Sequence, residues 1–351
     1  MSINCVLPQN NFERINLGHG GGGRLSHDLI KKVISLELGS TLVSCELDSG
    51  IVQLNDLNLE NRQLLFTTDS FVVDPLFFPG GDIGKLSIVG TINDLAVMGA
   101  APLGVSLSFI LEEGLLITDF RKILQSIRAE LDNLGTKIIC GDTKVVPRGK
   151  CDRIFINTSG IGYSMVLHPW EPKRIQIGDS IILSRDIGNH GAAVICTRQN
   201  LKLETPILSD CHELLSLTKS LINAQLDIRC CRDLTRGGLL SALVEVAETS
   251  HMQFEIDEKF IPKNESVGGL CELLGFDPLI LANEGACILF VSSDHSEKAI
   301  NILNQFDFCQ NACVIGKVTQ QREGGQCLLK LPSGVSRRLT LPSGELLPRI
   351  C

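Results

Sequence analysis

The sequence falls into two runs of alternating helical and strand patterns, separated by a stretch that two prolines interrupt. This stretch, residues 168–178, holds Pro169 and Pro172. A chain of 351 residues is longer than one hydrophobic core usually serves, so two domains are expected. The predicted organisation is a lead-in at residues 1–17, α/β domains at 18–167 and 178–335, and a flexible tail at 336–351.

Apolar residues recur at helical spacing in some segments and form short runs in others, which predicts mixed α and β structure throughout. Helices are expected at residues 24–38, 85–99, 118–134, 190–199, 210–224, 237–250 and 294–305. Strands are expected at residues 64–68, 102–109, 137–140, 152–165, 180–184, 252–256, 286–292 and 313–318. A hairpin is expected around the Pro-Ser-Gly turn at residues 332–334.

Composition excludes several classes of function. The net charge is -8 and no basic tract stands out, so we expect no nucleic-acid partner. The apolar stretch from Gly90 to Leu111 is about long enough for a membrane span, but it contains Asn93, Asp94 and Pro102. A buried helix followed by a buried strand explains it better, so no membrane association is expected.

The fourteen cysteines are scattered and include no CxxC pair, which argues against a zinc site. Residues 1–17 lack the charged start and apolar run of a signal peptide. A cytoplasmic chain with reduced thiols fits best. Most of these cysteines are expected to be small buried hydrophobes, with the last residue, Cys351, as the exception.

A glycine-rich loop precedes the first predicted helix. It consists of His19, Gly20, Gly21, Gly22 and Gly23. Backbone N–H groups of such a loop can approach an anion closely, and the following helix points its positive end at that anion. The loop is therefore a candidate phosphate cradle, although it lacks the Gly-Lys-Ser/Thr end of a P-loop and could equally be a flexible linker.

Four aspartates lie at predicted strand ends or within an apolar helix: Asp69, Asp94, Asp142 and Asp233. A carboxylate in apolar surroundings is costly unless it is paired or binds a metal. Magnesium with nucleotide phosphates prefers hard oxygen ligands of this kind. Taken singly, each could be a cap or turn residue, and Asp233 precedes a helix start as an N-cap does.

Three further residues are chemical candidates. Lys144 follows Gly141-Asp142-Thr143, where it could hold a transferring phosphoryl group or act as a base. Glu284 precedes an apolar strand, and from spacing alone both residues could be solvated surface charges. Cys351 offers a thiol at the end of the chain, beside Arg349 which could favour its thiolate, or it is an incidental terminal residue.

Eight motifs together resemble one known family. They are HGGGGR, TTDS, GGDIGKLS, NDLAVMGA, GDTKVV, RDLTRGGL, ANEG and the terminal PRIC, and they span His19 to Cys351. The combination is similar to the HypE family of hydrogenase maturation factors, within the aminoimidazole ribonucleotide synthetase (PurM-like) superfamily. That family commonly has Ser where this chain has Gly21.

The resemblance implies a two-domain fold of the α/β (α+β) class, with ATP in the cleft between the domains. It also implies a homodimer in which strands of the two N-terminal domains form a shared barrel. The implied nucleotide contacts are His19, Gly20, Gly21, Gly22, Gly23, Asp69, Asp94, Asp142 and Thr143. Asp69, Asp94, Asp142 and Asp233 would hold Mg²⁺, with Asp82 as a weaker candidate.

The implied chemistry begins with a carbamoyl group that a partner, HypF, places on Cys351. ATP phosphorylates the carbamoyl oxygen, and loss of phosphate leaves a thiocyanate once a base, Lys144 or Glu284, has removed the amide protons. The cyano group then passes to an iron held by HypC and HypD. The alternatives are a selenophosphate-synthetase-like enzyme, for which Cys5 lacks the glycine-rich setting, and a non-catalytic scaffold.

Overall fold

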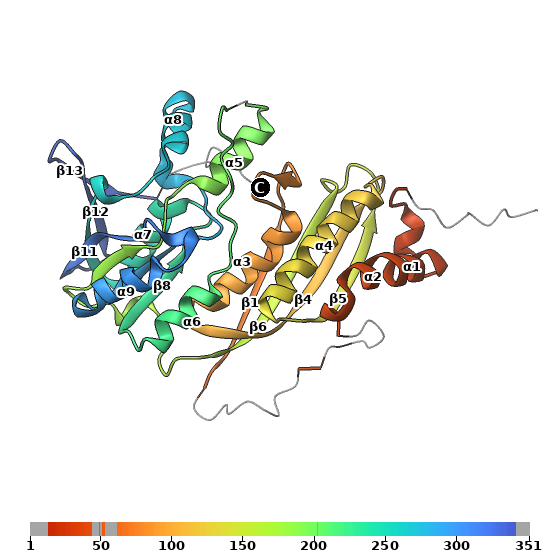
Figure 1. The fold of residues 1–351 in the computed structure, drawn as a ribbon, viewed down its shortest axis with the longest axis horizontal. Helices are drawn as coiled ribbons and strands as arrows, with labels where there is room; N and C mark the ends of the chain where they lie inside the picture. Colours follow the sequence, from red (N-terminus) through yellow and green to blue (C-terminus); the bar gives the residue numbers. More distant parts are fainter. Residues whose placement is uncertain (1–12, 44–48, 50, 53–61, 202, 342–351) are drawn as a thin grey trace, which may run out of the picture.

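The computed structural model describes residues 13–43, 49, 51–52, 62–201 and 203–341. The chain forms two halves, each built on its own sheet, that lie side by side (Figure 1). The N-terminal half has strands β1 (Leu64–Phe71), β2 (Phe77–Phe78), β3 (Gly81–Asp82), β4 (Ala100–Glu112), β5 (Ile138–Val146) and β6 (Ile154–Ser164). Its helices are α1 (Arg24–Leu29), α2 (Ser35–Leu38), α3 (Ile83–Val97) and α4 (Ile117–Leu134).

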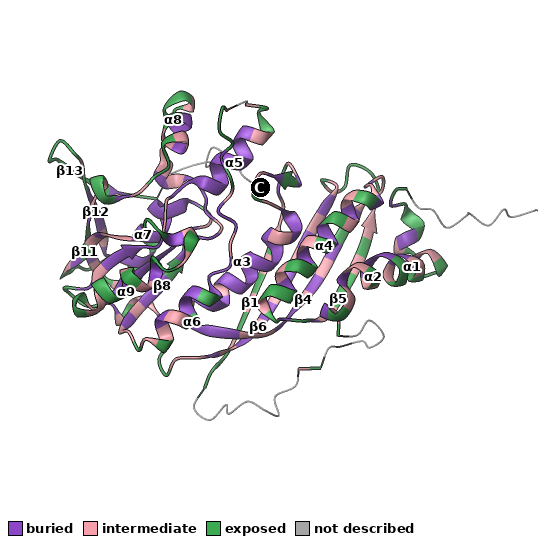
Figure 2. Cartoon of the chain, in the orientation of Figure 1, coloured by how far each residue is buried: buried purple, intermediate pink, exposed green. Residues whose placement is uncertain are grey.

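The main sheet of this half has the order β1-β6-β4-β5, and α3 and α4 cover one of its faces. The apolar side chains of α4, such as Phe120 and Ile127, all point inward, which gives an amphipathic helix. Helix α3 is instead buried on nearly all sides (Figure 2). It has the sheet on one side and α4, α6 and β8 on the others, so it lies between the two halves.

The other face of this sheet is open. Residues of β1 alternate between exposed and partly buried, as expected of a strand covered on one side. Leu64 and Phe66 of β1 are 55% and 72% exposed, and Ile110 of β4 is 41% exposed. The polar Thr68 and Ser70 are exposed on the same face of β1. Exposed apolar side chains gathered on one strand are typical of a surface that another protein chain covers.

The C-terminal half contains one seven-stranded sheet of order β13-β12-β9-β11-β7-β10-β8. The strands are β7 (Ser180–Leu183), β8 (Ile228–Asp233), β9 (Met252–Asp257), β10 (Cys287–Val291), β11 (Cys313–Gln321), β12 (Gln326–Lys330) and β13 (Ser336–Leu339). The helices are α5 (Asn189–Arg198), α6 (Leu215–Asn223), α7 (Gly238–Ser250), α8 (Glu265–Leu274) and α9 (Ser296–Leu303).

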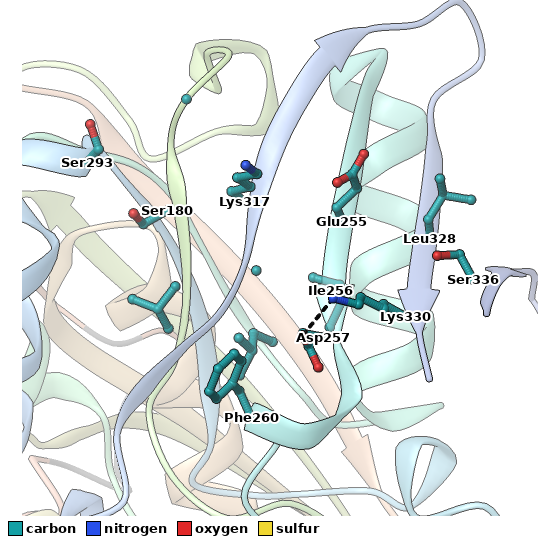
Figure 3. Close-up of a pocket in the computed structure, with 14 residues that line it drawn as sticks. Ser180, Glu255, Ile256, Asp257, Phe260, Ser293, Lys317, Leu328, Lys330 and Ser336 are labelled. Carbon is teal, nitrogen blue, oxygen red and sulfur yellow. Dashed lines mark ion pairs between the residues drawn. The ribbon is translucent and has the colours of Figure 1, made fainter. Parts of the chain in front are cut away.

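Helix α7 packs on one face of this sheet, and α6 and α9 cover part of the other. The uncovered part is a shallow hollow of about 890 Å³ over β9, β11 and β12 (Figure 3). Its lining combines apolar side chains with the charged Glu255, Asp257, Lys317 and Lys330, and Lys330 Nζ lies 3.7 Å from Asp257 Oδ2. The charged side chains help this face to remain open to solvent.

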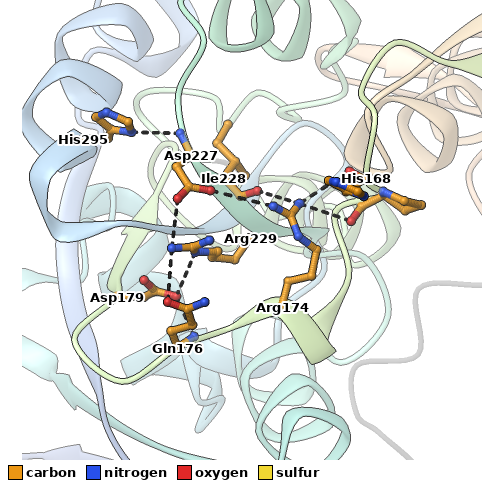
Figure 4. Close-up of polar contacts among 9 residues, drawn as sticks. His168, Arg174, Gln176, Asp179, Asp227, Ile228, Arg229 and His295 are labelled. Atoms are coloured by element: carbon orange, nitrogen blue, oxygen red, sulfur yellow. Dashed lines mark hydrogen bonds and ion pairs between the residues drawn. The ribbon is translucent and has the colours of Figure 1, made fainter.

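The segment between the two halves is anchored to the C-terminal sheet. Arg174 donates hydrogen bonds to the carbonyls of His168, Pro169 and Ile228 (Figure 4). Arg174 Nη2 also lies 3.7 Å from Asp227 Oδ1, beside the start of β8. The connecting residues are therefore fixed by charge-assisted bonds to β8 rather than forming a loose linker.

Most predicted elements are confirmed, with shifted ends. The helix predicted at 24–38 contains a π-helical stretch, Ile30–Ile34. The helix predicted at 118–134 begins one residue earlier, at Ile117. Strand β8 and helix α8 were not predicted. Across the described residues, no helix has both the length and the apolar character that a membrane crossing requires.

Both ends of the described chain are more ordered than predicted. Ile15, within the segment predicted to be a loose lead-in, is buried, and its N–H bonds the carbonyl of Leu115. The predicted hairpin at 332–334 is confirmed by β12 and β13. Strand β13 occupies residues 336–339, the first part of the predicted tail. Residues 1–12 and 342–351, including Cys351, lie outside the described residues.

Candidate active site

A cavity of about 520 Å³ lies between the two halves of the chain. The N-terminal half contributes β1 and α3 to its wall, and the C-terminal half contributes the end of β8, the start of α5 and the loop before β10. Four of its lining residues are acidic: Asp69, Asp94, Asp233 and Glu284. The sequence predicted all four as site residues.

Asp94 reaches the cavity from the last turn of α3. Its Oδ2 accepts a hydrogen bond from Thr67 Oγ1 at 2.6 Å, which fixes the carboxylate against β1. Asp69 follows two residues later on β1 and faces the same helix. Burial first, and repulsion by Asp94 second, raise the pKa of Asp69 to about 6 against the opposing effect of Arg236.

Asp233 and Glu284 approach from the other half. Asp233 is the last residue of β8 and lies opposite Cys287 of β10. Burial first, and repulsion by Asp94 second, raise the pKa of Asp233 to about 6. Burial and then repulsion by Asp210 and Asp233 raise the pKa of Glu284 well above its usual range. The possible alternative role of Asp233 as a helix N-cap is not observed, since Gly237 occupies that position of α7.

These raised pKa values indicate that the cavity suits a cation. Carboxylates that repel one another across a poorly solvated space are stabilised when positive charge lies between them. Among the described residues no three His, Cys, Asp or Glu side chains are close enough to hold a metal ion by themselves. Mg²⁺ bound together with nucleotide phosphates needs only one or two protein carboxylates, so this arrangement fits it.

The loop that carries Glu284 is held by two buried polar residues that sequence analysis missed. Asp210 accepts hydrogen bonds from the N–H groups of Glu284 and Gly285. Asn93, from α3, donates to the carbonyls of His212 and Glu284 and accepts from the N–H of Leu214. Asn93 had a detectable signal, since it stands beside Asp94 in an otherwise apolar helix.

Gly285 allows the loop that carries Glu284 to pass close to the backbone of Asp210. A Cβ atom at this position would lie 2.0 Å from the carbonyl oxygen of Asp210. Only glycine permits this close approach of two backbone segments. The ANEG motif therefore combines an acidic side chain with the residue that lets its loop pass Asp210.

Asp142 does not join the other three aspartates within one chain, contrary to the prediction. The strand predicted to end at Cys140 continues to Val146, so Asp142 lies inside β5. On the neighbouring strand β4, Ser108 is opposite Asp142, and on β6, Asn157 is opposite Ser108. Asp69 of β1 is opposite Thr158, the residue of β6 that follows Asn157. Neighbouring residues of a strand point to opposite faces, so Asp142 and Asp69 lie on different faces.

The same register separates the two predicted bases. Lys144 lies opposite Ile110 on the open face of β5, where it is exposed. Strands β5 and β1 are the two edges of the sheet, about 14 Å apart at the usual strand spacing. Within one chain, Glu284 belongs to the cavity between the halves and Lys144 does not.

The glycine loop lines a second, smaller cavity of about 270 Å³ at the β5 edge. Its wall combines His19, Gly20 and Gly22 with Asp142 and Thr143, and its floor is apolar. His19 is buried, and its Nδ1 accepts a hydrogen bond from the N–H of Asn16. Gly21 and Gly23 are exposed. The predicted cofactor residues thus divide between two cavities of one chain.

The weaker candidate, Asp82, has a structural role. It is the N-cap of α3, where its Oδ1 accepts hydrogen bonds from the N–H groups of Gly84 and Lys85. Asp82 does not line the carboxylate cavity.

Most thiols among the described residues are unsuited to chemistry. Eight of them are buried, and burial raises the pKa of Cys230 and Cys327 to about 12. A buried thiol with a raised pKa is a poor nucleophile. The expectation that these cysteines are packing residues is therefore confirmed for the buried ones.

Two family matches cover most of the chain. Residues 47–164 match the N-terminal domain of AIR synthase related proteins, and residues 176–327 match the C-terminal domain. Together with the cleft between two α/β halves, these matches define the chain as an AIR synthase related, PurM-like protein. The predicted fold class is confirmed.

Full-length relatives narrow the family. Carbamoyl dehydratase HypE of Rhodobacter capsulatus is 41% identical over 97% of this chain and 98% of that protein. The crystal structure of hydrogenase maturation protein HypE in complex with ATP has a TM-score of 0.89 and 38% identity, covering 95% of this chain and 99% of that one. The chain belongs to the HypE family of carbamoyl dehydratases, as its motifs predicted.

A third match includes a second protein. A crystal structure of a HypE–HypF complex contains a chain 41% identical to this one, with a TM-score of 0.76, covering 80% of this chain and 90% of that one.

Proposed function

We propose that this protein uses ATP to dehydrate a carbamoyl group held on Cys351, which yields a thiocyanate for the iron of a nickel-iron hydrogenase. The observation that carries this proposal is the carboxylate cavity between the two halves, in a member of the HypE family whose sequence ends in cysteine. The cavity has room for the phosphates and a bound cation, and Glu284 lies within it.

The reaction proceeds in two steps. The carbamoyl oxygen attacks the γ-phosphorus of ATP, which forms a new O–P bond and releases ADP. The nitrogen then loses its protons as the phosphorylated oxygen leaves, and the carbon–nitrogen triple bond forms. An amide oxygen is a poor leaving group, so its phosphorylation makes the elimination possible.

The residues of the cavity divide this work. Glu284 is suited to remove a proton, because a carboxylate with a raised pKa is a stronger base once ionised. Asp69, Asp94 and Asp233 would share Mg²⁺ with the phosphates, one or two of these carboxylates for each ion, and the metal would supply positive charge against the phosphates. The apolar floor of the glycine-loop cavity suits a nucleobase.

A homodimer would unite the two cavities. We propose that the open apolar face around Phe66 packs against the same face of a second chain, forming a shared barrel. The barrel would close with the β5 edge of one chain beside the β1 edge of its partner. This arrangement would bring Asp142, Thr143 and Lys144 of one chain toward the carboxylate cavity of the other. The predicted cofactor residues then line one ATP site across the interface.

Mixed dimers test this arrangement. Lys144→Ala and Glu284→Gln chains, carrying different tags, are co-purified as a heterodimer. If the two residues act across the interface, one of the two sites holds both changes and the other is intact, so about half of the wild-type activity returns. If Lys144 and Glu284 act within one chain, every site is defective and no activity returns.

The proposed partners follow from family membership. HypF would carbamoylate Cys351, in keeping with the solved HypE–HypF complex of a relative. A HypC–HypD complex would receive the cyano group. We place these steps in the cytoplasm, where reduced thiols persist.

Intact-mass measurement tests the proposed function. The protein is incubated with HypF, carbamoyl phosphate and ATP, and Cys351→Ala serves as the control. We expect the mass of one carbamoyl group to appear on the wild-type protein and one water then to be lost. A carbamoyl or cyano group found on the Cys351→Ala protein, or on another cysteine, would contradict the proposal.

A further inference from the structure

One buried histidine lines the carboxylate cavity without a role in the chemistry described above. His190 is the second residue of α5 and is only 1% exposed, yet it forms part of the cavity wall beside the acidic residues. Burial lowers the pKa of its imidazole to about 3, so the ring is neutral at physiological pH. A neutral imidazole carries one N–H donor, and its neighbours decide which nitrogen bears the proton.

Ser209 is the neighbour that bears on this question. Its Oγ lies 2.9 Å from Nδ1 of His190 and accepts a hydrogen bond from the N–H of Cys211. The hydroxyl can in turn donate its proton to Nδ1, and in that arrangement the imidazole proton is on the other nitrogen, Nε2. A donor role for Nε2 requires this tautomer.

The ring is also fixed in orientation by both halves of the chain. Phe78 packs against it edge to face, with ring centroids 5.2 Å apart. The N–H of Ser209 bonds the carbonyl of Pro79 at 2.8 Å, so the serine is itself tied to the N-terminal half. His190 is thus held rigidly at the junction, as a group that must present one donor in one direction.

The Nε2 donor has no partner of its own. No described residue forms a hydrogen bond with Nε2. Nε2 is also not one of the side-chain polar atoms that lack both a hydrogen-bond partner and contact with solvent. Since His190 lines the carboxylate cavity, that cavity is the space into which Nε2–H can open. A buried donor without a partner is costly, which points to a ligand that accepts this bond.

We propose that His190 is a catalytic residue whose neutral Nε2–H donates a hydrogen bond to the transferring phosphoryl group of ATP. The proposal deepens the function proposed above and rests on it. The carbamoyl oxygen is the less suitable acceptor, because a hydrogen bond there would withdraw electron density from the attacking atom. The phosphoryl oxygens and the leaving phosphate carry the negative charge that the donor stabilises during transfer.

No proton is transferred in this role. The O–P bond to the carbamoyl oxygen forms, the bond between the γ-phosphorus and the ADP oxygen breaks, and Nε2 keeps its hydrogen throughout. The Nε2–H group therefore accelerates ADP formation, the first step, and leaves deprotonation of the nitrogen to the bases.

The test is a single-turnover experiment on carbamoylated full-length protein mixed with Mg²⁺-ATP, in which ADP and thiocyanate are measured separately. His190→Ala should slow ADP formation by about 10²–10³-fold, with thiocyanate slowed equally. His190→Gln, whose amide N–H reaches about as far as Nε2, should recover at least about tenfold of that loss, whereas the shorter His190→Asn should not. His168→Gln, an exposed histidine outside the cavity, is the matched control.

Two further measurements keep the proposal falsifiable if His190→Ala folds poorly. Ser209→Ala keeps the ring and removes the bond to Nδ1, so it should slow ADP formation less than His190→Ala does. Nitrogen NMR of histidine-labelled wild-type protein should show the His190 proton on Nε2. A proton on Nδ1, or ADP formation at the wild-type rate in folded His190→Ala, overturns the proposal.

Failure of the proposed function is distinguishable from failure of this inference. If wild-type protein forms no thiocyanate from the carbamoylated tail, the proposed function itself fails. If wild-type protein is active and His190→Ala forms ADP normally but thiocyanate slowly, the histidine acts after phosphoryl transfer and the inference alone is wrong.

Discussion

Replacing Asn93 by alanine tests whether the junction between the halves positions Glu284. The side chain makes three hydrogen bonds across this junction, at 3.1 Å to the carbonyl of His212, 3.3 Å to that of Glu284 and 2.7 Å from the N–H of Leu214. Asn93→Ala leaves the carbonyl of His212 and the N–H of Leu214 without a partner, whereas the carbonyl of Glu284 keeps its bond from the N–H of His212. At about 1 kcal/mol for the partly buried carbonyl and about 2 kcal/mol for the buried N–H, the loss is about 3 kcal/mol.

The assay combines thermal unfolding with turnover. For a chain of this size a loss of about 3 kcal/mol lowers Tm by about 4 °C. Dehydration of the carbamoylated tail should fall as Glu284 loses its support, while carbamoylation by HypF should not change. Asn133→Ala, on the exposed side of α4, is the matched control. If Asn93→Ala has the Tm and the dehydration rate of this control, the hydrogen bonds of Asn93 neither stabilise the junction nor position Glu284.

Four other outcomes are expected. Asp94→Asn should weaken Mg²⁺-dependent ATP binding by at least about tenfold, since a hydrogen-bonded charge is worth about 1.5–3 kcal/mol, and calorimetry against exposed Asp132→Asn checks this. Because the pKa values of Asp69 and Asp233 are raised, the folded protein binds more protons than the unfolded chain does between about pH 4 and about pH 6. Metal-free protein should therefore lose stability as pH rises from about 4 to about 6. The difference in Tm between wild type and Asp94→Asn, measured across that range, should show this loss. Gly285→Ala should cost at least about 2 kcal/mol in unfolding measurements, because its Cβ meets the backbone of Asp210, whereas Gly268→Ala, where nothing is in the way, should not destabilise. Phe66→Glu should give a monomer in analytical ultracentrifugation, whereas Leu273→Glu, equally exposed on α8, should leave the assembly unchanged.

Part of the candidate site could be predicted because its signals are local. An aspartate in an otherwise apolar helix is visible in the sequence as a cost that needs a reason, and Asp94 lies where that reasoning placed it. Asp69 was predicted near a strand end and Glu284 just before a strand, and both line the cavity. The helix-period and strand-period patterns located most of the elements that carry them.

The position of Asp142 could not be predicted, because it depends on strand length and register. Gly141-Asp142-Thr143 resembles a turn after a strand, yet the chain remains extended to Val146. Which face Asp142 occupies then depends on its pairing with β4, and a one-residue shift would reverse it. Helix α8 was missed for a different reason, since Gly268 and Gly269 lower the helix propensity of its sequence.

The position of the carboxylates couples ligand binding to the packing of the two halves. Asp69 and Asp94 belong to the N-terminal half, whereas Asp233 and Glu284 belong to the C-terminal half, so their repulsion acts across the junction. Helix α3 holds that junction together through its contacts with α6 and β8 and through Asn93. A cation that neutralises these charges, or a phosphate donor that bridges them through a cation, must therefore also favour the packed arrangement of the two halves. The free energy by which the ligand favours packing equals the free energy by which packing favours ligand binding.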